Sequence, residues 1–185
     1  RAGFPLPLVD PDESADIGGG IFTRERPVFR GDLDAPVMNI QTESDTFSIL
    51  SSWRVRQPDT DTFRLWEIAG TAHADRHLLG PAADMIDCTA PINDGPAHLV
   101  AKAALRALDT WVRTGAVPPV AERIPLSDSA NNPVPLRDAD GIALGGVRTP
   151  PVDVPVDALS GVPVSSSIIC LLLGSTVALP DTRIA

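Results

Sequence analysis

Two short apolar segments, each followed at once by polar residues, constrain the fold of this chain more than any other feature. The first is APVMNIQT at residues 35–42, and the second is FRLWEIAG at residues 63–70. Short apolar runs bounded by proline, glycine or acidic residues are typical of buried β-strands. The connection between them predicts a short helix whose apolar face is formed by Phe47, Ile49, Leu50 and Trp53. Strand, helix and strand in this order predict two adjacent parallel strands of an α/β fold.

A longer helix is predicted between Pro96 and Gly115, because apolar residues recur there at helical spacing. The recurring residues are Val100, Ala104, Leu108, Trp111 and Val112. Asn93 or Asp94 is expected to cap this helix, and Pro96 suits its first turn. Glycine at the other end is a common helix stop, so Gly115 is expected to end the helix.

Composition divides the chain into three parts. Residues 1–34 hold scattered prolines and a triple glycine without a sustained period, which predicts a loop-rich connecting arm. Residues 35–117 carry the predicted strands and the long helix. Residues 118–185 hold 10 of the 19 prolines, so we expect a loop-rich, Pro-rich extension that packs on the core. Within it, residues 135–146 predict two short strands about an Asp-Gly turn.

Charge and hydropathy exclude several classes of partner. The net charge of −9 with scattered basic residues disfavours nucleic acid. The longest apolar run has six residues, 168–173, against the roughly 20 that a membrane span needs. Cys88 and Cys170 lack metal-site or redox spacing. Either one disulfide, which would suit a secreted or cell-wall enzyme, or two buried thiols remains open, and the compartment stays undecided.

Ionisable residues follow both predicted strands. Glu43 and Asp45 come directly after the first strand, and His73 follows the second. The carboxyl ends of adjacent parallel strands meet at one edge of a sheet, so we expect an acid and the imidazole to lie together. A carboxylate that accepts from Nδ1–H fixes the tautomer of histidine and stabilises the imidazolium. The pattern predicts two members of a Ser-His-Asp triad, with Asp45 favoured and Glu43 as the alternative acid.

These segments resemble a known family. APVMNIQTESD resembles the strand and acid turn of α/β-hydrolases, and FRLWEIAGTAHAD resembles their final strand and histidine loop. Residues 35–161, which include NDGPAHLVAKAALRALDTWVRTG and DGIALGGVRTPPVDVPVDALSG, are similar to a little-characterised bacterial family of α/β-hydrolase domains. The resemblance implies that His73 is the general base and Asp45 the acid, with Glu43 as its substitute.

The chain departs from the family pattern because it contains no G-x-S-x-G motif. Ser44, Ser48, Ser51 and Ser52 lie near the predicted acid, but none stands in a glycine-flanked turn between a strand and a helix. In this family the nucleophile and the oxyanion hole precede the acid and the histidine. We therefore expect the carboxyl-terminal part of an α/β-hydrolase fold, whose partner is the N-terminal half of the same polypeptide.

The resemblance implies a serine hydrolase that acts on a small-molecule carboxylic ester, with the nucleophile absent from this chain. The chain alone is expected to be inactive and poorly stable, because its sheet edge lacks the earlier strands. No cofactor is expected. The first alternative is a non-enzymatic structural or interaction module, which a fully paired, self-contained sheet would favour.

The second alternative is a zinc-dependent hydrolase. The segment TAHADRH offers His73, Asp75 and His77 as ligands, and His98 is the remaining histidine. Thr71 stands where the first histidine of such a turn should be, so the prediction is that no metal is bound.

Overall fold

The computed structural model describes residues 28–163, 165 and 167–180. The expected connecting arm at residues 1–34 lies largely outside this part of the chain. Residues 28–36, which the structure does describe, contain no helix or strand. The first regular element follows directly after Pro36.

The two apolar segments form parallel strands, as the sequence predicts. β1 (Val37–Thr42) pairs with β2 (Phe63–Ile68) in a register that sets Val37 beside Phe63 and Thr42 beside Ile68. Every residue of β2 is buried, whereas every residue of β1 is half-buried. In the described residues β1 pairs only with β2, so its other edge carries no strand.

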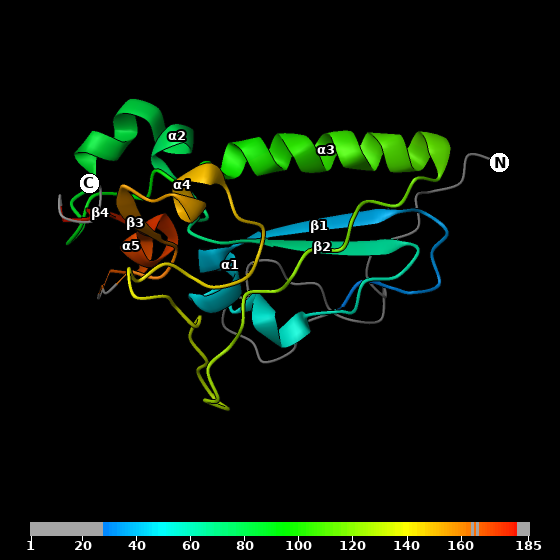
Figure 1. Ribbon diagram of the computed structural model, residues 1–185, viewed down its shortest axis with the longest axis horizontal. Coiled ribbons are helices and arrows are strands. Elements are labelled where there is room, and N and C mark those ends of the chain that lie inside the picture. The colour runs from blue at the N-terminus through cyan, green and yellow to red at the C-terminus, as the bar shows by residue number, and fades with distance from the viewer. Residues whose placement is uncertain (1–27, 164, 166, 181–185) are drawn as a thin grey trace.

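One face of this sheet is covered by the long helix α3 (Ala97–Thr114), which lies alongside both strands in Figure 1. Val100 and Ala104 of the helix pack against Trp66 and Ile68 of β2. These residues recur at helical spacing on α3 and at alternate positions on β2, so both apolar faces meet. Gly115 ends the helix at φ +75°, where its N–H donates to the carbonyl of Trp111 over 2.8 Å.

The opposite face carries charge that is paired within the protein. The buried carboxylate of Glu67 accepts two hydrogen bonds from Arg56, at 2.6 and 2.7 Å. The N–H of Ile124 donates to the same carboxylate over 2.9 Å. An apolar cluster below this face combines early and late parts of the chain: Phe47, Ala69, Ile124, Ile142, Ala143, Val152 and Leu159. Residues 118–185 therefore contribute to the same core as the strands.

Short elements complete the fold near the carboxyl ends of β1 and β2 (Figure 1). They are α1 (Glu43–Phe47), the 3-10 helices η1 (Ser52–Val55) and η2 (Gly80–Met85), α2 (Arg76–Leu79), α4 (Pro150–Asp153) and α5 (Ile168–Leu173). β3 (Asp157–Ser160) and β4 (Ser175–Ala178) pair in antiparallel orientation. The last 30 described residues thus hold more regular structure than their proline content predicts.

The two cysteines are joined by a disulfide. Cys88 follows η2, and Cys170 lies in α5, 82 residues further along the chain. The alternative of two free thiols is therefore wrong. No helix in the described part of the chain is long and apolar enough to cross a membrane.

The predicted short helix with Phe47, Ile49, Leu50 and Trp53 on one face is wrong. Instead, α1 begins at Glu43, directly after β1, and ends at Phe47. The Thr42 side chain accepts from the Asp45 N–H, and the Asp45 side chain accepts from the Thr42 N–H. This capping box starts a helix at the end of the strand, which the apolar spacing does not reveal.

Three further expectations need correction. Val112 was expected to recur with the apolar residues of α3 on one face, but it is 63% exposed on the outer side of the helix. Neither Asn93 nor Asp94 caps α3: Pro96 is its N-cap and makes no side-chain bond. The side-chain Oδ1 of Asn93 instead accepts from the Gly95 N–H. The turn at residues 138–141 is present, but a single bridge between residues 137 and 143 flanks it rather than two strands.

Candidate functional site

The first turn of α1 fixes the carboxylate of Asp45 at the carboxyl end of β1. Its Oδ2 accepts from the Thr42 N–H over 2.8 Å and from the Thr42 hydroxyl over 2.7 Å. The Asp45 N–H in turn donates to Thr42 Oγ1 over 3.2 Å. These contacts use one carboxylate oxygen of Asp45 to hold the helix start and leave Oδ1 for another donor.

The segment after β2 brings His73 to the same place. The His73 N–H donates to Ser44 Oγ over 2.6 Å, and the Ser44 N–H donates to the carbonyl of Thr71 over 3.4 Å. Ser44 is fully buried and thereby joins the first turn of α1 to the backbone on both sides of Ala72. The position of the imidazole is thus set by the helix that carries the acid.

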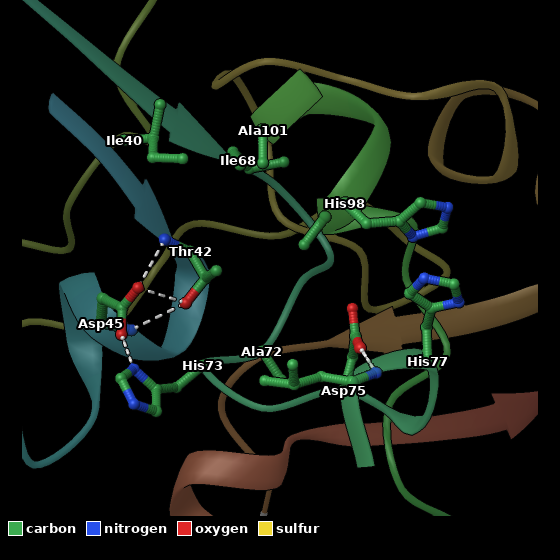
Figure 2. A pocket seen from close by; sticks show the side chains of 12 residues that line it. Ile40, Thr42, Asp45, Ile68, Ala72, His73, Asp75, His77, His98 and Ala101 are labelled. Atoms are coloured by element: carbon green, nitrogen blue, oxygen red, sulfur yellow. Dashed lines mark hydrogen bonds and ion pairs between the residues drawn. The ribbon is translucent and has the colours of Figure 1, made fainter. Parts of the chain in front are cut away.

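The two side chains meet as Figure 2 shows: His73 Nδ1 lies 2.7 Å from Asp45 Oδ1. A carboxylate only accepts hydrogen bonds, so this contact places the proton on Nδ1 and leaves Nε2 as the acceptor. The His73 side chain is 51% exposed, whereas that of Asp45 is 14% exposed. A partly buried acid and an accessible imidazole together form an arrangement suited to general-base chemistry.

Glu43 lies elsewhere. Its side chain is fully buried, and Oε1 pairs with Arg137 Nη2 at 2.5 Å. Oε2 accepts from the Gly70 N–H over 2.8 Å. The structure therefore places Asp45, not Glu43, against the imidazole.

A pocket of about 420 Å³ opens beside the Asp45–His73 pair. Its lining residues are Ile40, Thr42, Asp45, Ile68, Ala72, His73, Asp75, His77, Leu78, Ala97, His98 and Ala101. Six of these residues are apolar, and most of the polar ones are concentrated at two places. One is the acid–imidazole pair, and the other is a stack of His77 on His98 with ring centroids 3.8 Å apart (Figure 2).

The candidate zinc ligands do not converge. Asp75 is buried and accepts from the Leu78 N–H over 2.7 Å, so it caps α2. His77 and His98 stack on one another, while His73 contacts Asp45. Among residues 28–163, 165 and 167–180, no three histidine, cysteine or acidic side chains are placed to hold a metal ion.

Three of the nearby serines use their hydroxyls in bonds that hold the fold. Ser44 Oγ accepts from the backbone of His73. Ser48 Oγ donates to the carbonyl of Leu171 over 2.8 Å, and Ser51 Oγ donates to the carbonyl of Ser48 over 2.8 Å. All three hydroxyls therefore take part in hydrogen bonds within the fold.

Three residues of the site were not expected from the sequence. Thr42 could have been found, because a threonine three residues before an acid at the end of an apolar run is a capping signal. In the sequence, Ser44 offers only the signal of a candidate nucleophile, and nothing there indicates its bond to the His73 backbone. Arg137 reaches Glu43 from 94 residues away and has no local signal.

Comparison with known proteins supports the resemblance seen in the sequence. A family described as "Alpha/beta hydrolase domain" matches residues 2–185, which is nearly the whole chain. No curated protein and no solved structure matches the chain. The family match fits the parallel strands, the long covering helix and the acid–imidazole pair at the strand ends. The chain belongs to the family of alpha/beta hydrolase domains.

Proposed function

We propose that this chain carries the acid and the base of a Ser-His-Asp triad in a serine hydrolase that cleaves carboxylic esters. The observation that carries the proposal is the 2.7 Å contact between His73 Nδ1 and Asp45 Oδ1, with the imidazole half exposed. Membership of the hydrolase family supports a hydrolytic reaction. His73 is assigned as the general base and Asp45 as the acid.

In this proposal the two ring nitrogens of His73 have different roles. Nε2 of His73 removes the proton of the attacking serine and later returns it to the leaving alcohol. Asp45 keeps the proton on Nδ1 and balances the positive charge that the ring gains during attack. The apolar pocket beside the pair would receive part of a small-molecule ester.

The nucleophile and the oxyanion hole belong, in this proposal, to an N-terminal half of the same polypeptide. The chain is then the carboxyl-terminal part of the fold, with residues 35–117 in the core and residues 118–185 as an extension packed on it. The unpaired edge of β1 in the described residues supports this reading, because earlier strands would cover it. A fully paired sheet, which would favour a purely structural module, is not seen in that part of the chain.

The test is labelling of the full-length gene product with a fluorophosphonate probe, which reacts with activated serines. We expect rapid labelling of the wild type, and a loss of roughly 10³- to 10⁴-fold in rate for His73→Ala and Asp45→Asn. The isolated 185-residue chain is expected to remain unlabelled, because it lacks the nucleophile motif.

His98→Ala is the matched control, because His98 lines the same pocket but does not contact Asp45 in the described structure. It is expected to label within about tenfold of wild type, since it takes no part in proton transfer. An unlabelled full-length protein, or a His73→Ala variant that labels as fast as wild type, would falsify the serine-hydrolase proposal.

A further inference from the structure

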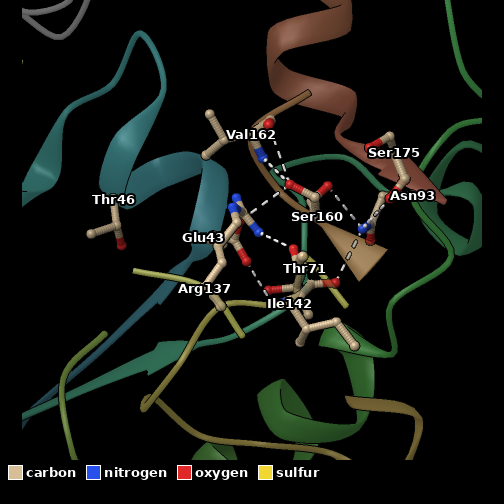
Figure 3. Close-up of polar contacts among 12 residues, drawn as sticks. Glu43, Thr46, Thr71, Asn93, Arg137, Ile142, Ser160, Val162 and Ser175 are labelled. Atoms are coloured by element: carbon tan, nitrogen blue, oxygen red, sulfur yellow. Dashed lines mark hydrogen bonds and ion pairs between the residues drawn. The ribbon is translucent and has the colours of Figure 1, made fainter. Parts of the chain in front are cut away.

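We propose that Arg137 is a positioning residue for Asp45, and that it acts through the buried carboxylate of Glu43. The inference rests on the proposed role of the Asp45–His73 pair. It assigns a task to the extension at residues 118–185, which supplies the guanidinium. Figure 3 shows the polar contacts that carry the argument.

Glu43 holds a charge in a place where water does not reach. Its side chain is 0% exposed and has three partners: Arg137 Nη2 at 2.5 Å, the Gly70 N–H at 2.8 Å and Ser160 Oγ at 3.4 Å. An ionised carboxylate in such a place requires both a counter-charge and hydrogen bonds. Among the three partners, only Arg137 supplies positive charge.

The Glu43 carboxylate connects the two strand ends that deliver the acid and the base. Glu43 is the first residue of α1, two residues before Asp45 and in the same capping turn. Its Oε2 binds the N–H of Gly70, which follows β2 and precedes His73 by three residues. A displacement of Glu43 would therefore move both the turn that carries Asp45 and the segment that leads to His73, and would change the distance between the two side chains.

Arg137 is itself held in place by the turn that follows it. Its Nη1 donates to the carbonyl of Gly141 over 2.8 Å, and Gly141 N–H closes the turn onto Asp138 at 3.1 Å. Ile142, next along the chain, is fully buried in the apolar cluster below the sheet. The turn is thus anchored in the core and presents Nη2 to Glu43 in a fixed direction (Figure 3).

Loss of the guanidinium would leave Glu43 as an unpaired buried charge. The carboxylate would then have to take up a proton or move toward water, and either change disturbs the first turn of α1. Because Asp45 Oδ1 is aimed at His73 by that turn, the imidazole would lose the acceptor that keeps its proton on Nδ1. The expected effect is on the tautomer of His73 within the folded protein.

The experiment uses full-length protein labelled with ¹³C,¹⁵N-histidine, with His73→Gln to assign the resonances. The ¹⁵N shifts of the ring, read through the carbon-bound ring protons, report which nitrogen carries the proton. We expect the Nδ1–H tautomer in wild type and a shift toward Nε2–H in Arg137→Met. The rate of fluorophosphonate labelling is expected to fall about 10- to 100-fold, which is less than the full effect of losing a general base.

Arg56→Met is the matched control. Arg56 forms another ion pair of the sheet region, with Glu67, which is 1% exposed and lies on β2. This variant is expected to lower the melting temperature as Arg137→Met does, while the His73 tautomer stays as in wild type. A common loss of stability is thereby separated from an effect on the acid–imidazole pair.

The double variant Glu43→Gln/Arg137→Met removes both charges and keeps an acceptor for the Gly70 N–H. We expect the double variant to fold, even if Arg137→Met alone does not. We also expect its His73 to regain the Nδ1–H tautomer. The proposal is overturned if Arg137→Met folds with an unchanged tautomer, if Arg56→Met shifts it equally, or if the double variant does not regain it. A failed triad proposal is recognised separately, because the wild type would then remain unlabelled whatever the tautomer.

Discussion

At the scale of single residues, the site depends on hydroxyl groups that hold the backbone and side chains around Asp45 and His73. Ser44 is the clearest case, because its buried hydroxyl accepts from the His73 backbone while its own N–H donates to Thr71. It therefore couples the start of α1 to the loop that carries the imidazole. A side chain that the sequence offers as a candidate nucleophile instead anchors the backbone of His73.

Ser44→Ala is expected to lower the free energy of unfolding by about 0.5 to 1.5 kcal/mol, because it removes the hydroxyl that accepts from the His73 N–H. It should also slow fluorophosphonate labelling of the full-length protein, since the imidazole loses part of its support. Urea denaturation and labelling rates measure the two effects. Ser48→Ala is the control: it removes a hydroxyl bonded to Leu171 and should leave the labelling rate unchanged. Equal labelling by both variants would contradict the anchoring role.

At the scale of elements, α3 has one face buried against the sheet and an opposite face that is exposed. Trp111 is 3% exposed, whereas its neighbour Val112 is 63% exposed. Leu99 and Leu105 are also largely exposed on this helix, so the apolar residues of α3 form more than one stripe. Only the stripe with Val100, Ala104 and Trp111 faces inward.

Trp111→Ala is expected to lower the free energy of unfolding by about 3 to 5 kcal/mol, the usual effect of truncating a large buried aromatic residue. Val112→Ala should change it by less than about 0.5 kcal/mol, because the side chain is exposed. Chemical denaturation of the two variants checks the difference. Similar losses for both would mean that the outer stripe is also covered in the protein.

The elements also show what local sequence patterns reveal. β1, β2 and α3 were predictable because their apolar periodicity is set by residues close in the chain. The start of α1 was missed because a polar capping box, not apolar spacing, determines it. α5 and β4 are only six and four residues long, and contacts from distant segments stabilise them. Such contacts leave no periodic signal.

In the site, too, features set by nearby residues were predictable and features set by distant contacts were not. The proximity of Asp45 and His73 was predictable, since each follows one of two parallel strands. The sequence also favoured Asp45 over Glu43, in agreement with the contact to His73. The partner of Glu43 was not predictable, because the approach of Arg137 is determined by the tertiary fold. The disulfide was equally open, since Cys88 and Cys170 meet only after the chain has folded back.

At the scale of the whole molecule, the disulfide joins the segment after the histidine loop to the late helix α5. The joined segments also share backbone contacts: Ala74 N–H donates to Leu172 at 3.2 Å, and Asn93 N–H donates to Leu173 at 3.1 Å. The loop that follows His73 therefore rests on residues near the end of the described chain.

Loss of this bond is expected to lower the free energy of unfolding by about 4.5 kcal/mol, from the chain-entropy model for a loop that spans 82 residues. The urea midpoint should fall when dithiothreitol is added to the wild type. In Cys88→Ala/Cys170→Ala the midpoint should be low already and should not respond to the reductant. A wild-type midpoint that is unaffected by full reduction would show that the bond adds nothing to stability.

The residues that support the acid–imidazole pair lie late in the sequence, which affects when the site can form during synthesis. Arg137 and Ser160 contact Glu43, and Leu172 of α5 accepts from Ala74 of the histidine loop; each contact joins residues more than 80 positions apart. A ribosome makes the chain from the amino end, so Asp45 and His73 leave the exit tunnel long before their supports exist. The nascent chain must therefore complete nearly all of this sequence before the acid and the imidazole take up their final geometry.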